Sequence, residues 1–310
     1  MSLESTCRRL IDEFQSRPSL RAGSLITTVF GDSIAPRGGV VWLGSLIQAM
    51  SEFGISERLV RTSVFRLAKD GWLQSKQIGR RSFYSLTDEG RERFEQATHR
   101  IYGEPTTNWD GKWCLLLLSA LDAQDRERVR KEAGWLGFGA MSANVLAHPT
   151  PDAADLDITL RRLQLADEVV VMSAETLRSE AAMRRLAQSS WNLAEIDTRY
   201  ENFVHMFRPV LAALGKATVI KPKTAFLLRT MLIQEYRKVL LRDPQLPAEL
   251  LPADWHGRPA YQLCRNLYLG VQQAADEFVT EAMETADGPL PPPSKIVASR
   301  FGGVGSGGAS

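Results

Sequence analysis

The chain has 310 residues and a formal net charge of only +2, so the whole molecule is not a general binder of polyanions or anionic membranes. Hydrophobic residues make up 44% and charged residues 24% of the chain, which excludes a largely disordered protein. Because a single core usually stops growing at about 250–300 residues, we expect two or three domains.

Cysteines and apolar runs indicate the compartment. Cys7, Cys114 and Cys264 are odd in number and far apart in the chain, which is typical of reduced thiols. The longest apolar run, 113–118, is much shorter than the about 20 residues that a membrane-spanning helix needs, and the first twenty residues lack a signal-peptide pattern. We therefore expect a cytoplasmic protein with no membrane partner.

The first part of the chain, residues 20–103, has helical patterns followed by a hairpin pattern. Ser56 follows a glycine turn and is a good N-cap, and Gly71 ends the helix that it begins. The expected elements are a helix that breaks near Gly31, an apolar segment at 40–43, a helix at 44–50, the helix between Ser56 and Gly71, strand-like runs at 72–78 and 82–86, and a helix capped by Thr87.

The helix after Ser56 has an apolar face and a cationic face. At about 100° per residue, one side carries Val60, Ser63, Val64 and Leu67. Between residues 56 and 84 there are seven Lys or Arg and two acidic residues. Helix, turn, helix and hairpin in this order predict a winged helix-turn-helix domain that places this helix in the major groove of double-stranded DNA. The predicted DNA-binding residues are Ser56, Arg58, Arg61, Thr62, Arg66 and Lys69 on the helix, and Arg80 and Arg81 on the wing.

Two points stay open in this interpretation. A solvated helix can carry arginines without binding DNA, and some winged helices make only protein contacts. Phe65 lies on the cationic half of the helix, where it either covers a neighbouring helix, which we favour, or contacts a thymine methyl group.

The second part, residues 106–175, alternates strand and helix patterns in the order βαββαβ, which predicts a ferredoxin-like domain that supports association of subunits. The segment "GFGAMS" is not a convincing dinucleotide site, because the third glycine is missing and a helix precedes it. Asp122 is either a metal ligand of a nuclease formed by two subunits or, together with Asp125, a cap of the following helix.

The third part, residues 176–285, is mainly helical, and residues 286–310 form a tail rich in Pro and Gly that we expect to be disordered. An aromatic and aliphatic stripe at helical spacing is expected to be core: Trp191, Leu193, Ile196, Tyr200, Phe203, Val204 and Phe207. The fold class is thus a multidomain α+β protein with a winged helix-turn-helix, a central ferredoxin-like domain and a C-terminal helical domain.

Sequence patterns of catalysis are missing. The four histidines, at positions 99, 148, 205 and 256, have no Cys/His spacing suited to zinc, and neither a "GxSxG" elbow nor a "GxxxxGK[ST]" phosphate loop occurs. We expect no enzyme, no metal site and no cofactor. The alternatives that remain are the nuclease centred on Asp122 and an assembly module that does not bind DNA.

Four stretches of the sequence resemble one family, the phenylacetic-acid degradation repressors called PaaX. They are "RTSVFRLAKDGWL", "GWLGFGAMSANV", "WNLAEIDTRYENF" and "EYRKVLLRDPQLPAELLPADWHG", and the Gly-rich tail departs from the pattern. The resemblance implies a bacterial transcriptional repressor of an aromatic (phenylacetate- or styrene-type) catabolic operon. It also implies a homodimer, formed through a central Cas2-like domain, that leaves its palindromic operator when phenylacetyl-coenzyme A binds as effector.

An aryl-coenzyme A needs cations for its phosphates and an apolar slot for its aryl group. The candidate ligand-binding residues near the proline-rich loop are Arg229, Tyr236, Arg237, Arg242, Trp255, His256 and Arg258. In the competing interpretation, Asp243, the prolines and Trp255 only fix a connection between helices, and Arg237 and Arg242 bond to carboxylates or carbonyls.

Overall fold

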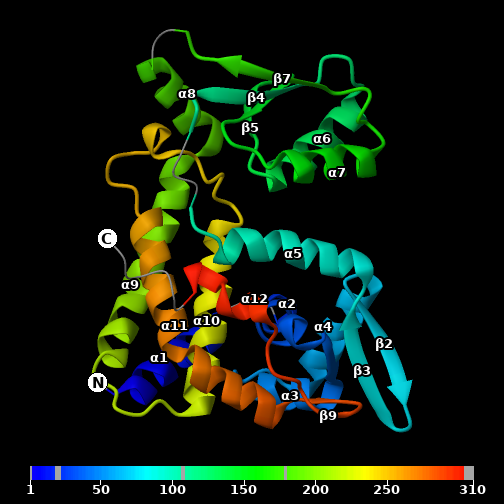
Figure 1. Cartoon of the computed structure of the whole chain (residues 1–310), viewed down its shortest axis with the longest axis vertical. Coiled ribbons are helices and arrows are strands. Elements are labelled where there is room, and N and C mark those ends of the chain that lie inside the picture. Colours follow the sequence, from blue (N-terminus) through cyan, green and yellow to red (C-terminus); the bar gives the residue numbers. More distant parts are fainter. Residues whose placement is uncertain (1, 18–21, 106–108, 178–179, 304–310) are drawn as a thin grey trace. The chain divides into compact units, whose positions relative to one another are not determined.

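The structure, a computed structural model, describes residues 2–17, 22–105, 109–177 and 180–303 and combines helices with small antiparallel sheets (Figure 1). It has two compact units, one drawn from residues 1–103, 203–237 and 259–310, the other from 104–202 and 238–258. The sequence predicts a separate helical domain at 176–285, but these residues are divided between the two units. Three boundaries between the units, at 202/203, 237/238 and 258/259, fall inside three long helices.

The first unit begins with a helix that the sequence analysis does not predict. In α1 (Leu3–Gln15) the apolar residues recur at helical spacing and are buried, and Ser2 caps the first turn. The break predicted near Gly31 is confirmed, because α2 ends at Val29 and a π-helical turn, Phe30–Ile34, follows. The next elements are β1 (Val40–Trp42), α3 (Leu43–Ser51), α4 (Glu57–Lys69), β2 (Leu73–Ile78), β3 (Arg81–Leu86) and α5 (Asp88–Tyr102).

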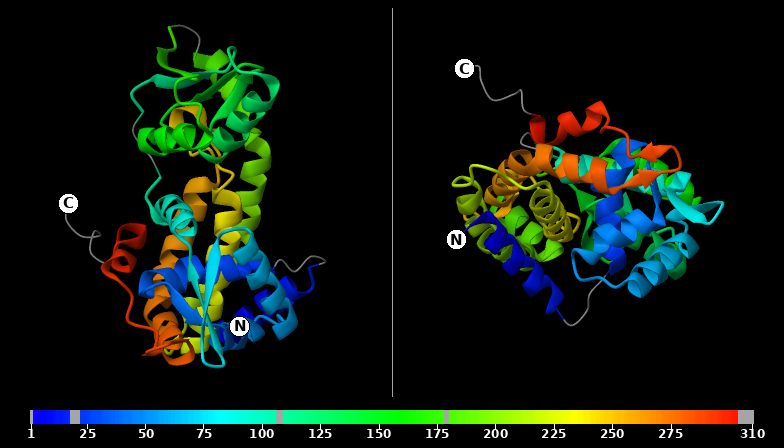
Figure 2. Two further views of the ribbon diagram at one scale, coloured as in Figure 1. Left: turned by 90° about the vertical axis from the view of Figure 1, so that its right-hand side faces the viewer. Right: turned by 90° about the horizontal axis from the view of Figure 1, so that it is seen from below.

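These elements form a three-stranded antiparallel sheet beside a helical core. The strand order is β1-β3-β2, and a two-residue turn with Gly79 at φ 59° joins β2 to β3 in a long ribbon (Figure 2). Ser56 and Thr87 cap α4 and α5, as predicted. Gly54 and Gly71 have φ of 73° and 76°, a conformation that glycine adopts without strain, so both turns flanking α4 are set by the sequence.

The second unit contains a four-stranded antiparallel sheet with strand order β5-β6-β4-β7. Helices α6 and α7 cover a core formed with one face of the sheet, and α8 (Glu180–Trp191) packs beside β5 with the loop around Leu246. In chain order the elements are β4 (Lys112–Leu117), α6 (Ala123–Trp135), β5 (Gly139–Ser142), β6 (Val145–His148), α7 (Ala153–Leu163) and β7 (Val170–Glu175).

Three long helices complete the two units: α9 (Leu193–Leu214), α10 (Pro222–Leu240) and α11 (Gly257–Ala282). The prediction that the aromatic stripe is core is confirmed for its residues from Leu193 to Phe207, which are all buried. Trp191 is half-buried and donates a hydrogen bond to the carbonyl oxygen of Gly137. Among the described residues, no helix is both long and apolar enough to span a bilayer.

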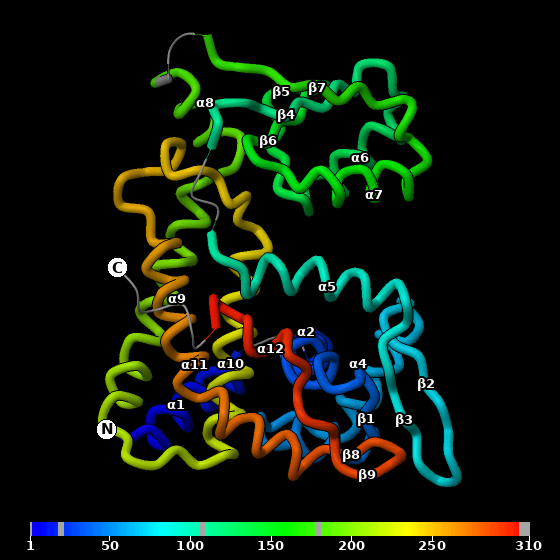
Figure 3. The backbone as a smooth tube through the Cα atoms, viewed as in Figure 1, coloured from blue at the N-terminus to red at the C-terminus, as the bar shows by residue number. Residues whose placement is uncertain are grey.

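The C-terminal segment corrects one prediction. Residues 286–303 are not a disordered tail, because β8 (Glu284–Thr285) pairs with β9 (Gly288–Pro289) and a short helix, α12 (Lys295–Ala298), follows (Figure 3). The Arg300 guanidinium donates to Asp32 and to the Tyr268 hydroxyl, and Phe301 is fully buried. Few apolar residues suffice here because a buried charge anchors the segment. Residues 304–310 lie outside the described residues.

Candidate nucleic-acid interface

Helix α4 presents the predicted two faces. Val60 and Val64 are fully buried and Ser63 is nearly so, whereas every predicted DNA-contacting residue on the helix is exposed. The buried face contacts α2 and α3 of the same unit. The exposed residues are Ser56, Arg58, Arg61, Thr62, Arg66 and Lys69.

The guanidinium and ammonium groups of α4 differ in how far the protein neutralises them. Arg61 pairs with Glu57 one turn earlier at 2.7 Å, and both side chains are more than half exposed. Such an exposed pair contributes well under about 1 kcal/mol and is easily exchanged for another anion. Within the part of the chain that the structure describes, Arg58, Arg66 and Lys69 have no carboxylate partner. The face therefore carries positive charge that the unit itself does not neutralise.

Two hydroxyl groups on α4 have local partners. The Ser56 hydroxyl accepts the Leu59 amide at 3.4 Å as an N-cap, and the Thr62 hydroxyl donates to the Arg58 carbonyl oxygen at 2.9 Å. In this geometry the Ser56 O–H can still donate, and the Thr62 oxygen can still accept, so both groups retain capacity for a ligand.

The hairpin adds two arginines with different surroundings. Arg80 lies exposed in the turn and has no carboxylate partner among the described residues. Arg81 instead pairs with Glu284 at 2.9 Å and lies over the Trp42 ring, 4.3 Å from the ring centroid. The sequence analysis does not associate Trp42 and Glu284 with the hairpin, because 39 and 203 residues separate them from Arg81 and only the pairing of β1 with β3 and the C-terminal segment brings them there.

Phe65 contradicts the packing that the sequence analysis favours. Its side chain is 68% exposed and lies on the cationic half of α4, away from Val60 and Val64. The helix periodicity assigns the face correctly but does not reveal whether a neighbour reaches a given side chain.

The predicted ligand-binding residues are divided between the two units, and Arg229 is not available for a ligand. Its guanidinium is buried in the first unit, where it pairs with Asp32 at 2.9 Å and with Asp276 at 2.6 Å and donates to the Ser33 hydroxyl. Burial raises the pKa of Asp32, but the charges of Arg229 and Arg300 outweigh burial and hold this pKa below its ordinary value. Arg229 is thus part of a buried ionic network.

Tyr236 and Arg237 also belong to the first unit. Tyr236 is buried, with its ring 5.4 Å from that of Phe203. Arg237 is partly buried and donates to the Ser24 carbonyl and hydroxyl oxygens at 3.3 and 3.1 Å. The bond to the Ser24 carbonyl oxygen agrees with the competing interpretation, in which Arg237 bonds to carboxylates or carbonyls.

The other four candidates lie in the second unit. Arg242 and Arg258 are exposed, and Trp255 is half-buried with its ring 5.7 Å from that of Tyr200. The backbone amide of His256 donates to Asp197 at 2.7 Å, and its ring nitrogen lies 3.0 Å from the same carboxylate. Asp243, just after α10, accepts from the hydroxyl of Tyr200 on α9 at 2.6 Å, which fixes the start of the connection that leads to α11.

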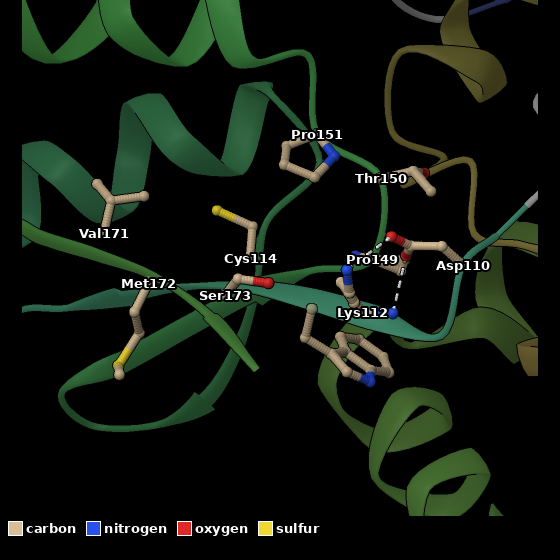
Figure 4. Close-up of a pocket in the computed structure, with 10 residues that line it drawn as sticks. Asp110, Lys112, Cys114, Pro149, Thr150, Pro151, Val171, Met172 and Ser173 are labelled. Carbon is tan, nitrogen blue, oxygen red and sulfur yellow. Dashed lines mark hydrogen bonds and ion pairs between the residues drawn. The ribbon is translucent and has the colours of Figure 1, made fainter. Parts of the chain in front are cut away.

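Asp122 caps α6, since its carboxylate accepts the Asp125 amide at 2.8 Å, so the capping alternative is confirmed. Elsewhere in this unit, an open hollow of about 510 Å³ lies along β4 and β7 (Figure 4). Its lining includes Lys112, Cys114 and Met172, and the carboxylate of Asp110 accepts the Lys112 amide. Among the described residues, no three His, Cys, Asp or Glu side chains are grouped as a metal site would require.

Fold and surface together define a multidomain α+β protein in which one helix and the tip of one hairpin expose cations that have no carboxylate partner among the described residues. Three family models match it: PaaX-like protein at residues 21–90, PaaX protein central Cas2-like domain at 106–186, and PaaX-like protein C-terminal domain at 191–281. The chain belongs to the PaaX family.

Two relatives extend the comparison. The chain is 44% identical over 284 residues to the transcriptional repressor PaaX of Escherichia coli (strain K12), which covers 91% of this chain and 90% of that protein. A solved structure, the uncharacterized protein Rv0674 from Mycobacterium tuberculosis, is similar with a TM-score of 0.48 and 24% identity, over 76% of this chain and 89% of that chain.

Proposed function

We propose that this chain is a bacterial transcriptional repressor, a regulator rather than an enzyme, that binds double-stranded DNA. One observation carries the proposal: α4 exposes Arg58, Arg66 and Lys69 without carboxylate partners in the described chain, while its opposite face is buried. A helix fits the major groove, where arginine pairs with guanine or phosphate oxygens. The name of the 44% identical relative, a transcriptional repressor, supports the same function.

In this proposal, α3, the turn at Gly54, α4 and the β2–β3 hairpin act as a winged helix-turn-helix. The recognition helix α4 enters the major groove, and Arg80 at the hairpin tip reaches the adjacent backbone or minor groove. Arg81, the first residue of β3 after the turn, is tied to Trp42 and Glu284, and these contacts fix the direction of the wing.

The central sheet is the proposed dimerisation element. Its strand order, β5-β6-β4-β7, is the order of a ferredoxin-like fold and leaves β7 at an edge. On β7, Val170, Val171 and Met172 are about half exposed, at 52, 46 and 45%. An apolar edge strand of this kind pairs readily with another chain, so a second copy is the proposed partner. Two recognition helices at a fixed separation then match a palindromic operator.

Phenylacetyl-coenzyme A is the proposed effector, and the controlled genes are those of phenylacetate- or styrene-type catabolism in the bacterial cytoplasm. An effector causes release only if its affinity is higher for the form of the protein that does not fit DNA than for the form that does. A difference of about 2.7 kcal/mol between these two binding free energies changes operator occupancy about 100-fold. Arg229 is bound by carboxylates and Arg237 by Ser24, both within the first unit. In the second unit, Arg242 and Arg258 are the cations proposed for the phosphates, and Trp255 is the proposed aromatic surface.

The effector site is tested by isothermal titration of the full-length protein with phenylacetyl-coenzyme A. Replacing Arg258→Ala or Trp255→Ala is expected to weaken binding about 10- to 100-fold, as loss of a charged hydrogen bond or an aromatic contact does. Arg161→Ala, at an exposed arginine on α7 that pairs with the exposed Asp157, is the control. Unchanged affinity in both variants would remove these residues from the site.

Repressor function itself is tested by incubating the purified protein with a pool of random duplexes and sequencing those it retains. We expect a palindromic sequence to be enriched, and its enrichment to fall when phenylacetyl-coenzyme A is added. Retention of no duplex, or of all duplexes equally at physiological salt, would contradict the proposal.

A further inference from the structure

Phe65 is an apolar side chain placed in the middle of the cationic face of α4. With about 100° per residue, its direction falls between those of Arg61 and Thr62 and lies on the side opposite Val60 and Val64. Arg61 is one turn before it and Lys69 one turn after it, so charged groups border the ring along the helix. The ring is 68% exposed, the largest exposure of any aromatic residue among the exposed hydrophobic side chains of the described chain.

No part of the described chain compensates for this exposure. Within the described ranges, no second ring and no guanidinium lies against Phe65. An exposed phenylalanine adds nothing to the stability of its own unit, whereas a polar residue would keep the helix soluble. A ring held out among cations therefore fits a partner that is anionic on its flanks and has an apolar point at its centre.

The major groove of DNA has this character. Phosphates border it, its floor is lined by polar base edges, and the 5-methyl group of thymine is the apolar group among them. On the proposed function, Arg58, Arg66 and Lys69 meet phosphates or guanines, and the ring between them faces the floor of the groove. We infer that Phe65 is a specificity-determining residue that packs on the 5-methyl group of a thymine in each half of the operator.

The inference rests on the proposed function, and DNA that contains uracil tests the contact of Phe65 with the methyl group separately from DNA binding itself. Uracil differs from thymine only by lacking the 5-methyl group, and it keeps the same hydrogen-bonding groups. A duplex enriched from the random pool is resynthesised with one thymine at a time replaced by uracil. The affinity of the full-length protein for each duplex is then measured by fluorescence anisotropy.

At one position of the half-operator, replacing thymine by uracil is expected to weaken binding by wild-type protein about fourfold. Replacing it at the symmetry-related positions of both halves should weaken binding about fifteenfold, because each replacement removes one buried methyl group. Phe65→Ala is expected to bind the thymine duplex more weakly than wild-type protein does. The ratio of its affinities for the thymine and uracil duplexes, the thymine-to-uracil ratio, should be near one at that position. Arg66→Ala is the matched control, since it should weaken binding and keep the ratio. Because Phe65 is exposed, its replacement should leave the thermal midpoint unchanged.

The possible outcomes are distinct. If Phe65→Ala and wild-type protein show the same thymine-to-uracil ratio at every position, the inference is overturned while DNA binding stands. If Phe65→Ala binds DNA as wild type does and instead loses self-association in light scattering, the ring contacts protein and the inference is also overturned. If wild-type protein retains no duplex, the proposed function fails first.

Discussion

Single residues of this chain use charge in two different ways. On α4, Arg58 and Arg66 remain in water with no carboxylate partner in the described chain, so their charge is available to a ligand. In the core of the first unit, Asp32 is almost fully buried and forms ion pairs with both Arg229 and Arg300. The exposed cations of α4 can bind an anionic ligand, whereas the buried ion pairs of Asp32 stabilise the folded first unit.

The buried carboxylate gives a prediction for stability. Asp32→Asn leaves Arg229 and Arg300 short of a buried anion and is expected to lower the free energy of unfolding by about 3–5 kcal/mol. Asp157→Asn, which removes an exposed carboxylate paired with Arg161, should change it by less than about 1 kcal/mol. Urea unfolding followed by circular dichroism measures both variants. Equal effects of the two replacements would contradict the role given to Asp32.

The same residue sets a pH dependence. The folded-state pKa of Asp32 lies below its ordinary value, which is about 3.9 in an unfolded chain, because Arg229 and Arg300 outweigh the effect of burial. Its contribution is therefore present above about pH 4 and is lost as the pH falls through the folded-state pKa. As the pH is lowered below about 4, the urea concentration at the unfolding midpoint should decrease for wild-type protein, and it should decrease less steeply for Asp32→Asn.

At the scale of elements, the C-terminal segment acts as a brace for the first unit. Arg300 reaches Asp32 and Tyr268, the amide of Ser294 donates to the Pro36 carbonyl, and Glu284 holds Arg81 of the hairpin. The segment thus ties the N-terminal elements to α11 and to the first residue of β3.

This brace can be tested by replacing its anchor. Arg300→Ala removes the buried guanidinium and is expected to cost about 3–5 kcal/mol of unfolding free energy, since Asp32 loses one of its cations. Lys295→Ala, an exposed residue of the same segment, is the matched control and should have almost no effect. If Arg300→Ala melts at the wild-type temperature, the segment does not brace the unit.

The elements that the sequence predicts well are those with a local signal. The cap at Ser56, the glycine turns and the alternation of faces on α4 all arise within a few residues, so their positions can be read from the chain. Proline and glycine content misleads for residues 286–303, because composition does not reveal that Arg300 finds a buried carboxylate 268 residues away.

The candidate sites follow the same rule. The exposure of the α4 cations follows from helix periodicity, which is local. The assignment of Arg229 to a ligand fails because Asp32 and Asp276, its partners, lie far from it in the sequence. A run of cations near an aromatic residue has the same appearance whether the cations meet phosphates or buried carboxylates. Periodicity also cannot tell that Phe65 has no neighbour to cover it.

At the scale of the whole molecule, the proposed repressor requires two copies. Val171→Lys places a charge on the exposed edge strand β7 and is expected to convert a dimer to a monomer in light scattering. Its affinity for the full operator should then fall at least tenfold, while affinity for a half-operator stays the same. Val219→Lys, at a valine of the first unit that is 75% exposed, is the control. A Val171→Lys protein that remains dimeric would exclude β7 as the interface.

The cationic face of α4 is tested most directly by the salt dependence of DNA binding in the triple variant Arg58→Ala, Arg61→Ala and Arg66→Ala. Anisotropy titrations with the enriched duplex at several salt concentrations should give an affinity at least 100-fold weaker than that of wild-type protein. The slope of log affinity against log salt should also be shallower by about two to three units, while Arg161→Ala matches wild type. A triple variant with wild-type affinity and slope would contradict the assignment of α4 to DNA.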